Sequence, residues 1–89
     1  MDEMTNKLFD LTKKLSDAVT FRQKVDARAD LQYYLWQSEG RAMVELDAIP
    51  NLHLVKLILG AGPRGALYEA VVARMHDLRR GPVRPSEVM

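Results

Sequence analysis

Residues 49–75 read IPNLHLVKLILGAGPRGALYEAVVARM and contain two apolar helical patterns around a glycine-rich turn. The first pattern follows Asn51, a residue type that caps helix N-termini well. Its apolar residues fall on most sides of the expected helix: Leu52, Leu54, Val55, Ile58 and Leu59. A helix that is apolar nearly all round is buried, so we expect this one at the centre of a small all-α protein.

A last helix is expected after the turn. It starts near Pro63, because a proline fits the first helical turn, where its missing N–H has no partner. The stripe expected to face inward is Leu67, Ala70, Val71, Arg74, Met75 and Leu78, which is apolar except for Arg74. Gly81 and Pro82 end it, and residues 82–89 are expected to form a flexible C-terminal tail.

Two further helices are predicted upstream, over residues 5–19 and 21–37. Apolar residues of the first recur at helical spacing: Leu8, Leu11, Leu15 and Ala18. Thr20 and Gln23 have the spacing of a capping box at the start of the second. In that second helix we expect one inward stripe of Val25, Ala29, Tyr33 and Trp36, with Leu31 and Leu35 on an adjacent stripe.

The connection between these two pairs of helices is short. Gly40 suits a left-handed C-terminal cap for the helix before it. Residues 41–49 are expected to form a short helix, since a strand would have no partner strand. The chain is thus predicted to be one all-α domain over residues 1–81, a compact bundle of four to six helices. Its expected core is Leu8, Leu11, Leu15, Leu31, Leu35, Trp36, Val55, Ile58, Leu67 and Val71.

Composition excludes several classes of function. The chain has 89 residues and no cysteine, which rules out disulfides, thiolate metal sites and a cysteine nucleophile. Lack of cysteine fits a reducing compartment, so we expect a cytoplasmic protein. No apolar run approaches the roughly 20 residues of a membrane span, and we expect no membrane partner.

No group of residues predicts catalysis. His53 and His76 have no ligand partner at metal-binding spacing, and we expect His53 partly buried and His76 exposed. Asp26 and Asp30 lie one helical turn apart near arginines, which indicates a solvated helix face rather than acid–base chemistry. Ser16 lacks a nucleophile context. We therefore expect a protein that is not an enzyme and binds no cofactor or metal.

Three aromatic residues cluster in the helix over residues 21–37. Neighbouring positions on a helix point in different directions, so Tyr33, Tyr34 and Trp36 cannot all face the core. We expect Tyr33 and Trp36 inward and Tyr34 at least half exposed. An exposed aromatic of this kind is a candidate interface anchor.

Charge is distributed unevenly along the chain. Residues 1–48 carry 7 basic and 9 acidic side chains, a net of −2, and residues 49–89 carry 6 basic and 3 acidic, a net of +3. Faces of opposite charge predict binding to a similar helical domain, or self-association. The candidate basic face is Arg64, Arg74, Arg79 and Arg80. The candidate acidic face is Asp17, Asp26, Asp30, Glu39 and Glu45.

Two alternatives remain open. The stretch from Gly60 to Ala66, GAGPRGA, resembles the hairpin of helix-hairpin-helix DNA-binding motifs, in which turn amides and a helix N-terminus face a phosphate. Few basic residues flank it beyond Lys56 and Arg64, so we do not expect nucleic acid as the main partner. A small phage- or plasmid-encoded inhibitor of a host protein would use its surface as an adaptor does.

Two stretches together resemble a known family. Residues 26–35, DARADLQYYL, are similar to the second helix of the bacterial effector-associated domains. Residues 49–55 and 62–71 are similar to the closing pair of helices of those domains. The resemblance implies a death-fold-like, non-enzymatic adaptor that recruits an effector in bacterial conflict or signalling systems by pairing with a like domain. A weaker likeness to sterile alpha motif domains, at residues 39–46 and 62–64, implies the same kind of role.

Overall fold

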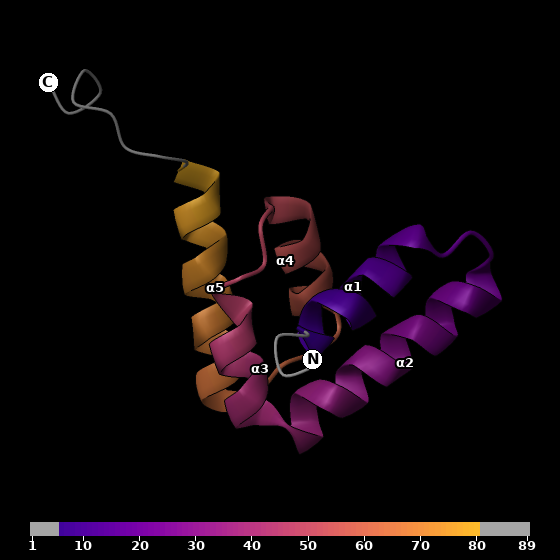
Figure 1. The fold of residues 1–89 in the computed structure, drawn as a ribbon, viewed down its shortest axis with the longest axis horizontal. Coiled ribbons are helices and arrows are strands. Elements are labelled where there is room, and N and C mark those ends of the chain that lie inside the picture. Colours follow the sequence, from indigo (N-terminus) through magenta and orange to yellow (C-terminus); the bar gives the residue numbers. More distant parts are fainter. Residues whose placement is uncertain (1–5, 81–89) are drawn as a thin grey trace, which may run out of the picture.

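The computed structural model describes residues 6–80, which form five α-helices and no strand. The helices are α1 (Lys7–Asp17), α2 (Phe21–Gln37), α3 (Glu39–Leu46), α4 (Leu52–Gly60) and α5 (Gly65–Arg80) (Figure 1). The prediction of an all-α bundle of four to six helices is confirmed. The expected tail, residues 82–89, lies outside the described residues.

Side-chain caps set the helix starts. The capping box is formed, because the Gln23 amide N–H donates to Thr20 Oγ1 (3.1 Å) and the Thr20 N–H donates to Gln23 Oε1 (3.2 Å). Asn51 caps α4 by accepting from the Leu54 N–H at 3.0 Å. The predicted bounds of α2 and the predicted start of α4 are therefore confirmed. Asn6 caps α1 in the same way, so that helix is shorter than the predicted 5–19.

The glycines with positive φ angles are not the glycine that was expected to have one. Gly40 lies inside α3 and has no positive φ, so its prediction as a left-handed cap was wrong. Ser38 alone separates α2 from α3, which therefore begins and ends earlier than the predicted 41–49. Positive φ angles occur at Gly62 (91°), in the turn before α5, and at Gly65 (61°), the first residue of α5. The backbone turns as far as Gly65, so α5 begins there rather than near Pro63.

Helix α1 is the hub of the packing. It contacts α2, α3 and α4, while α5 packs on α3 and α4 at the other side of the molecule (Figure 1). Helices α1 and α2 form an antiparallel hairpin whose connecting loop projects away from α5 (Figure 1). The side chains that these contacts bury most completely are Leu8, Thr12, Leu31, Leu35, Leu46, Ile49, Val55, Ile58, Leu67 and Val71.

The predicted core is largely confirmed, with two exceptions. Leu11 is half-buried against the core rather than inside it, and the Trp36 side chain is 45% exposed. The inward stripe of α2 was also wrong. Its buried residues are Ala27, Leu31, Tyr34 and Leu35, whereas Val25, Ala29, Tyr33 and Trp36 are exposed. Because both stripes are apolar, the packing of α1, rather than local periodicity, selects the one that is buried.

Candidate interaction surface

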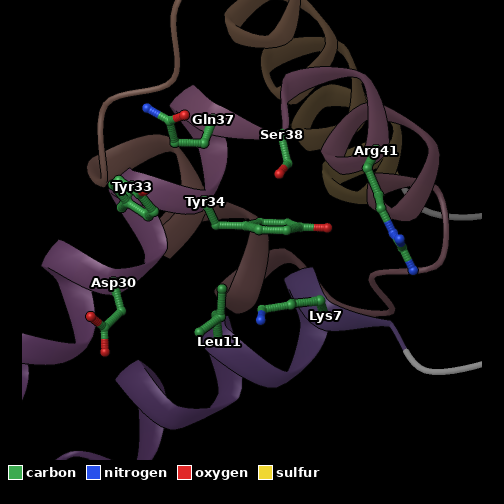
Figure 2. Close-up of a pocket in the computed structure, with 8 residues that line it drawn as sticks. All are labelled: Lys7, Leu11, Asp30, Tyr33, Tyr34, Gln37, Ser38 and Arg41. Carbon is green, nitrogen blue, oxygen red and sulfur yellow. The ribbon is translucent and has the colours of Figure 1, made fainter. Parts of the chain in front are cut away.

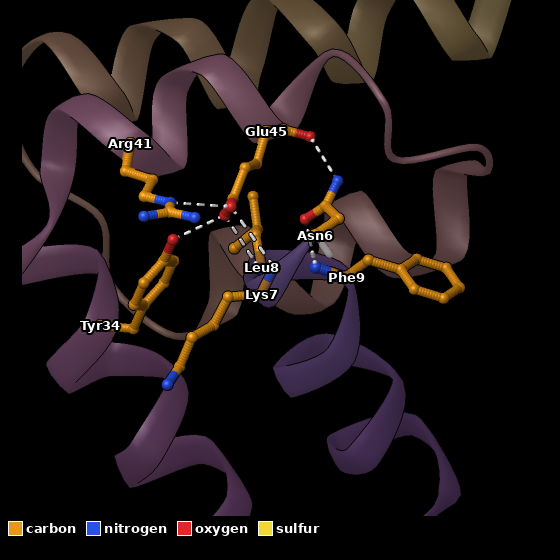
Figure 3. A network of polar contacts seen from close by, with 7 residues as sticks. All are labelled: Asn6, Lys7, Leu8, Phe9, Tyr34, Arg41 and Glu45. Atoms are coloured by element: carbon orange, nitrogen blue, oxygen red, sulfur yellow. Dashed lines mark hydrogen bonds and ion pairs between the residues drawn. The ribbon is translucent and has the colours of Figure 1, made fainter. Parts of the chain in front are cut away.

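Glu45 of α3 holds the N-terminus of α1 from across the fold (Figure 3). Its Oε1 accepts hydrogen bonds from the Leu8 N–H (3.0 Å) and the Tyr34 hydroxyl (2.6 Å). Its Oε2 accepts from the Lys7 N–H (3.4 Å) and from Arg41 Nε (3.3 Å). A carboxylate thus satisfies two of the free amides that begin α1, where the helix dipole also favours negative charge.

These contacts shift two pKa values in opposite directions. Burial alone would raise the pKa of the Glu45 carboxyl, but hydrogen bonds from Tyr34, the two backbone amides and Arg41 outweigh it and lower that pKa. Burial, then the hydrogen bond to Glu45 and its charge, raise the pKa of the Tyr34 hydroxyl, against an opposite effect of Arg41. At neutral pH the pair is therefore a carboxylate and a neutral phenol.

This arrangement corrects two predictions. Tyr34 was expected at least half exposed, but its side chain is 8% exposed because it lies on the inward stripe of α2. Glu45 was assigned to an acidic outer face, but its carboxylate is mostly enclosed by its hydrogen-bond partners. Neither side chain is free to anchor a partner. The exposed tyrosine of α2 is Tyr33, at 68%.

The apolar stripe that α2 leaves outside borders a groove between α2 and α4. The groove has a volume of about 530 Å³. Its residues come from the two helices, with one α1 residue at the base: Leu15, Phe21, Lys24, Val25, Arg28, Ala29, Gln32, Lys56, Leu57 and Gly60. Phe21 is 83% exposed and Val25 48%. Large apolar side chains left beside a concave surface are typical of a binding site.

Two hydrogen bonds join α2 to the loop that follows α4. The Gln32 side chain donates to the Ala61 carbonyl (2.8 Å), and Trp36 Nε1 donates to the Gly62 carbonyl (2.9 Å). Both bonds tie the C-terminal half of α2 to the loop after α4. Within residues 6–80, no side-chain hydrogen bond joins the N-terminal half of α2, from Phe21 to Arg28, to α4, and this half of α2 lines the groove.

The charges at this groove have one sign. Its charged lining residues are Lys24, Arg28 and Lys56, and none of the residues that line it is acidic. Within residues 6–80, none of these three side chains takes part in an ion pair. The groove therefore has two parts. Its floor is the apolar row Phe21, Val25 and Ala29 of α2, and its rim is the unpaired basic residues Lys24, Arg28 and Lys56 on the two flanking helices. This surface was not predicted, because Val25 and Ala29 share a helical stripe with Tyr33 and Trp36, which were expected to face inward.

The predicted basic face is not one surface. Arg64 lies over the Trp36 ring, with its guanidinium carbon 3.9 Å from the ring centre. Arg74 is half-buried and donates to the Ile49 carbonyl at 2.9 Å. Arg79 is exposed near the far end of α5, roughly 20 Å along the helix from Arg64. The Arg80 side chain lies outside the described part of the chain.

The predicted acidic residues are also divided. Asp17 pairs with Lys13 on α1 at 3.2 Å. Asp26 and Asp30 are exposed on α2, as expected, but basic residues share their surroundings. A hollow of about 590 Å³ lies where α1, α2 and α3 meet. Figure 2 shows Asp30 across this hollow from Lys7 and Arg41. This face is mixed in charge rather than acidic.

The glycine turn does not present a free phosphate cradle. Glu39 of α3 reaches the start of α5, where its Oε2 accepts from the Leu67 N–H at 3.4 Å. A carboxylate thus occupies the helix N-terminus that would face a phosphate in a helix-hairpin-helix motif. A phosphate there would meet this negative charge. The geometry therefore weighs against the DNA-binding alternative.

The two histidines lie at the surface. His76 is exposed, as predicted, whereas His53 is exposed rather than partly buried, and its Nε2 lies 3.1 Å from Ser16 Oγ. This Ser–His contact was not foreseen. Within residues 6–80 no carboxylate hydrogen-bonds the His53 ring, so the orienting member of a hydrolytic triad is missing. The same residues contain no group of three or more His, Asp or Glu side chains able to hold a metal ion.

A scan against family models, a search of curated proteins and a search of solved structures each find no match to this chain. None of the helices over residues 6–80 is long and apolar enough to cross a membrane.

Proposed function

We propose that this protein is a non-enzymatic protein–protein interaction module whose main docking element is α2. The observation that carries this proposal is that α2 leaves Phe21 and Val25 exposed beside a concave, basic groove. A small domain has few apolar side chains to bury, so a stripe left outside a formed core indicates a partner that covers it.

The first partner to test is another helical domain of this kind, in a bacterial conflict or signalling system. The sequence resemblance to effector-associated domains supports that choice, and it implies an adaptor that acts in the cytoplasm. The basic groove replaces the α5 arginines as the charged surface, and two of its three basic residues, Lys24 and Arg28, come from the net-negative half of the chain. An inhibitor of a host protein would use the same surface.

Val25 and Val44 provide a matched pair for the test. Both are exposed valines on helices, but Val25 lines the groove and Val44 lies on α3. Tagged wild-type chain is used to capture partners from the source cells, and the partner identified is then purified and titrated. Val25→Asp should weaken binding at least tenfold, roughly 1.4 kcal/mol, whereas Val44→Asp should not change it. Equal affinity of all three chains would refute the proposed docking element.

A further inference from the structure

We propose that the α2–α4 groove binds a single amphipathic helix of the partner that carries carboxylates on both sides of its apolar stripe. This inference rests on the proposed function and adds the chemistry of the bound element. It follows from the spacing of the floor, the sign of the rim and the charges elsewhere on the chain.

The floor has a helical spacing. Phe21, Val25 and Ala29 succeed each other at every fourth position of α2, so they recur about every 6 Å along its axis. Apolar side chains at i, i+4 and i+7 of a partner helix recur at similar intervals and can interdigitate with them. A peptide that binds by adding a strand would instead need a free sheet edge, and residues 6–80 form no strand. The floor therefore favours a helix as the occupant.

The rim selects the charge of that helix. Lys24 and Arg28 border the groove on the α2 side, and Lys56 borders it on the α4 side. A helix lying between them would place its flanking residues against positive charge on both sides. Acidic flanks would find partners there, whereas basic flanks would meet like charges at a cost that suppresses binding. Charge complementarity therefore specifies Glu or Asp beside the apolar stripe.

Both aspartates of α2 lie beside basic residues. Asp26 shares a hollow with Lys14 and Asp17, and Asp30 shares one with Lys7 and Arg41. A second copy would therefore bring lysine or arginine toward the rim along with each of these aspartates. The observations favour a helix of a different protein, and self-association through the groove becomes an outcome that the experiment can detect.

The test is selection from a displayed library of amphipathic helices of about 18 residues, enough for five turns. Apolar residues are fixed at i, i+4, i+7 and i+11, and each flanking position offers Glu, Gln or Lys. The full chain is the target, and enriched peptides are synthesised for titration by fluorescence anisotropy. We expect enrichment of Glu on both flanks, and binding that weakens as salt is raised.

Two charge-reversal pairs decide whether the groove is the site. Lys24→Glu with Arg28→Glu should weaken peptide binding at least tenfold. Lys14→Glu with Arg79→Glu makes the same change in net charge elsewhere and should leave affinity within about twofold. Circular dichroism confirms that each variant is folded. Enrichment of Lys, no charge preference, no binders, or equal loss in both pairs would overturn the inference.

Two further outcomes separate this inference from the proposed function. If Val25→Asp abolishes capture of the natural partner but no acidic helix binds, the docking element stands and the acidic helix is wrong. If sedimentation shows self-association that Lys24→Glu with Arg28→Glu abolishes, the occupant is a second copy and the inference is again wrong.

Discussion

The hydroxyl of Tyr34 in α2 donates a hydrogen bond of 2.6 Å to the carboxylate of Glu45 in α3. The same carboxylate accepts from two amides at the start of α1. Three helices that are separate in sequence therefore meet at one charged side chain. Since a buried polar group that loses its partner costs more than the bond contributes, this point is sensitive to substitution.

Replacement of Glu45 should destabilise the fold strongly. Glu45→Gln keeps the shape but removes the charge and turns an amide NH₂ group toward donors, so we expect a loss of about 2–4 kcal/mol in the free energy of unfolding. Urea denaturation measures this loss. Arg41→Ala removes a largely exposed ion-pair partner and should cost less than about 1 kcal/mol. Equal losses in both variants would contradict the assigned role of Glu45.

Stability should fall in acid. The pKa of Glu45 is lowered on folding, so the unfolded chain binds a proton more readily. The stabilisation is complete above the unfolded pKa of about 4.3 and is lost as pH falls through the folded pKa. Urea midpoints measured from pH 6 to pH 3 should therefore decrease, and less steeply in Glu45→Gln than in wild type. Parallel curves for the two proteins would show that Glu45 is not responsible.

Alanine substitutions at Gly62 and Gly40 should change the stability of the protein in opposite directions. Gly62 has φ 91°, and an added Cβ would lie 3.2 Å from Gln32 Nε2, so Gly62→Ala should cost about 1–3 kcal/mol. Gly40 lies in α3 with nothing within 4 Å of an added Cβ. Gly40→Ala should therefore stabilise the protein by about 0.5–1 kcal/mol. Thermal denaturation of both variants checks the pair, and destabilisation by Gly40→Ala would be inconsistent with this structure.

Reversing the charge of Arg74 should lower the free energy of unfolding, whereas reversing the charge of Arg79 should not. Arg74→Glu replaces a donor to the Ile49 carbonyl with a half-buried negative charge, and we expect a loss of about 2 kcal/mol or more. Arg79→Glu changes an exposed residue and should stay within about 0.5 kcal/mol. Urea denaturation distinguishes them. Binding experiments that reverse Arg74 would thus confuse lost stability with a lost interface, unlike those on Arg79.

The fluorescence of Trp36, the one tryptophan in the sequence, should depend on its contact with Arg64. The Arg64 guanidinium covers one face of Trp36, so Arg64→Ala should expose the ring and shift its fluorescence to longer wavelength. The loss of the cation–π contact should cost about 0.5–1 kcal/mol. Arg79→Ala provides the control and should leave the emission unchanged. An unshifted spectrum in Arg64→Ala would show that the two side chains do not stack in solution.

Local signals in the sequence predicted the helices well. The cap at Asn51 and the box at Thr20 and Gln23 are interactions between residues three positions apart, so the sequence alone contains them. The burial of Val55 and Ile58 also follows from a helix that is apolar on most sides. These features require no knowledge of how the helices are arranged.

The candidate site could not be predicted in the same way. Helix α2 has two adjacent apolar stripes, and its packing against α1 and α3 decides that Tyr34 is buried while Val25 stays outside. A shift of one position on a helix turns a side chain by about 100°, so this choice reverses the assignment of core and surface. The role of Glu45 was hidden for a similar reason, since its partners lie on other helices.

The bonds from Glu45 to α1 also matter during synthesis, because α1 leaves the ribosome before α3 does. Asn6 satisfies one amide of α1 locally, but the N–H of Leu8 depends on a residue 37 positions later. In a nascent chain the Lys7 and Leu8 amides therefore lack their carboxylate partner until α3 has emerged. Fragments that stop before Glu45 would keep that helix end frayed, open to proteases that act on the incomplete protein.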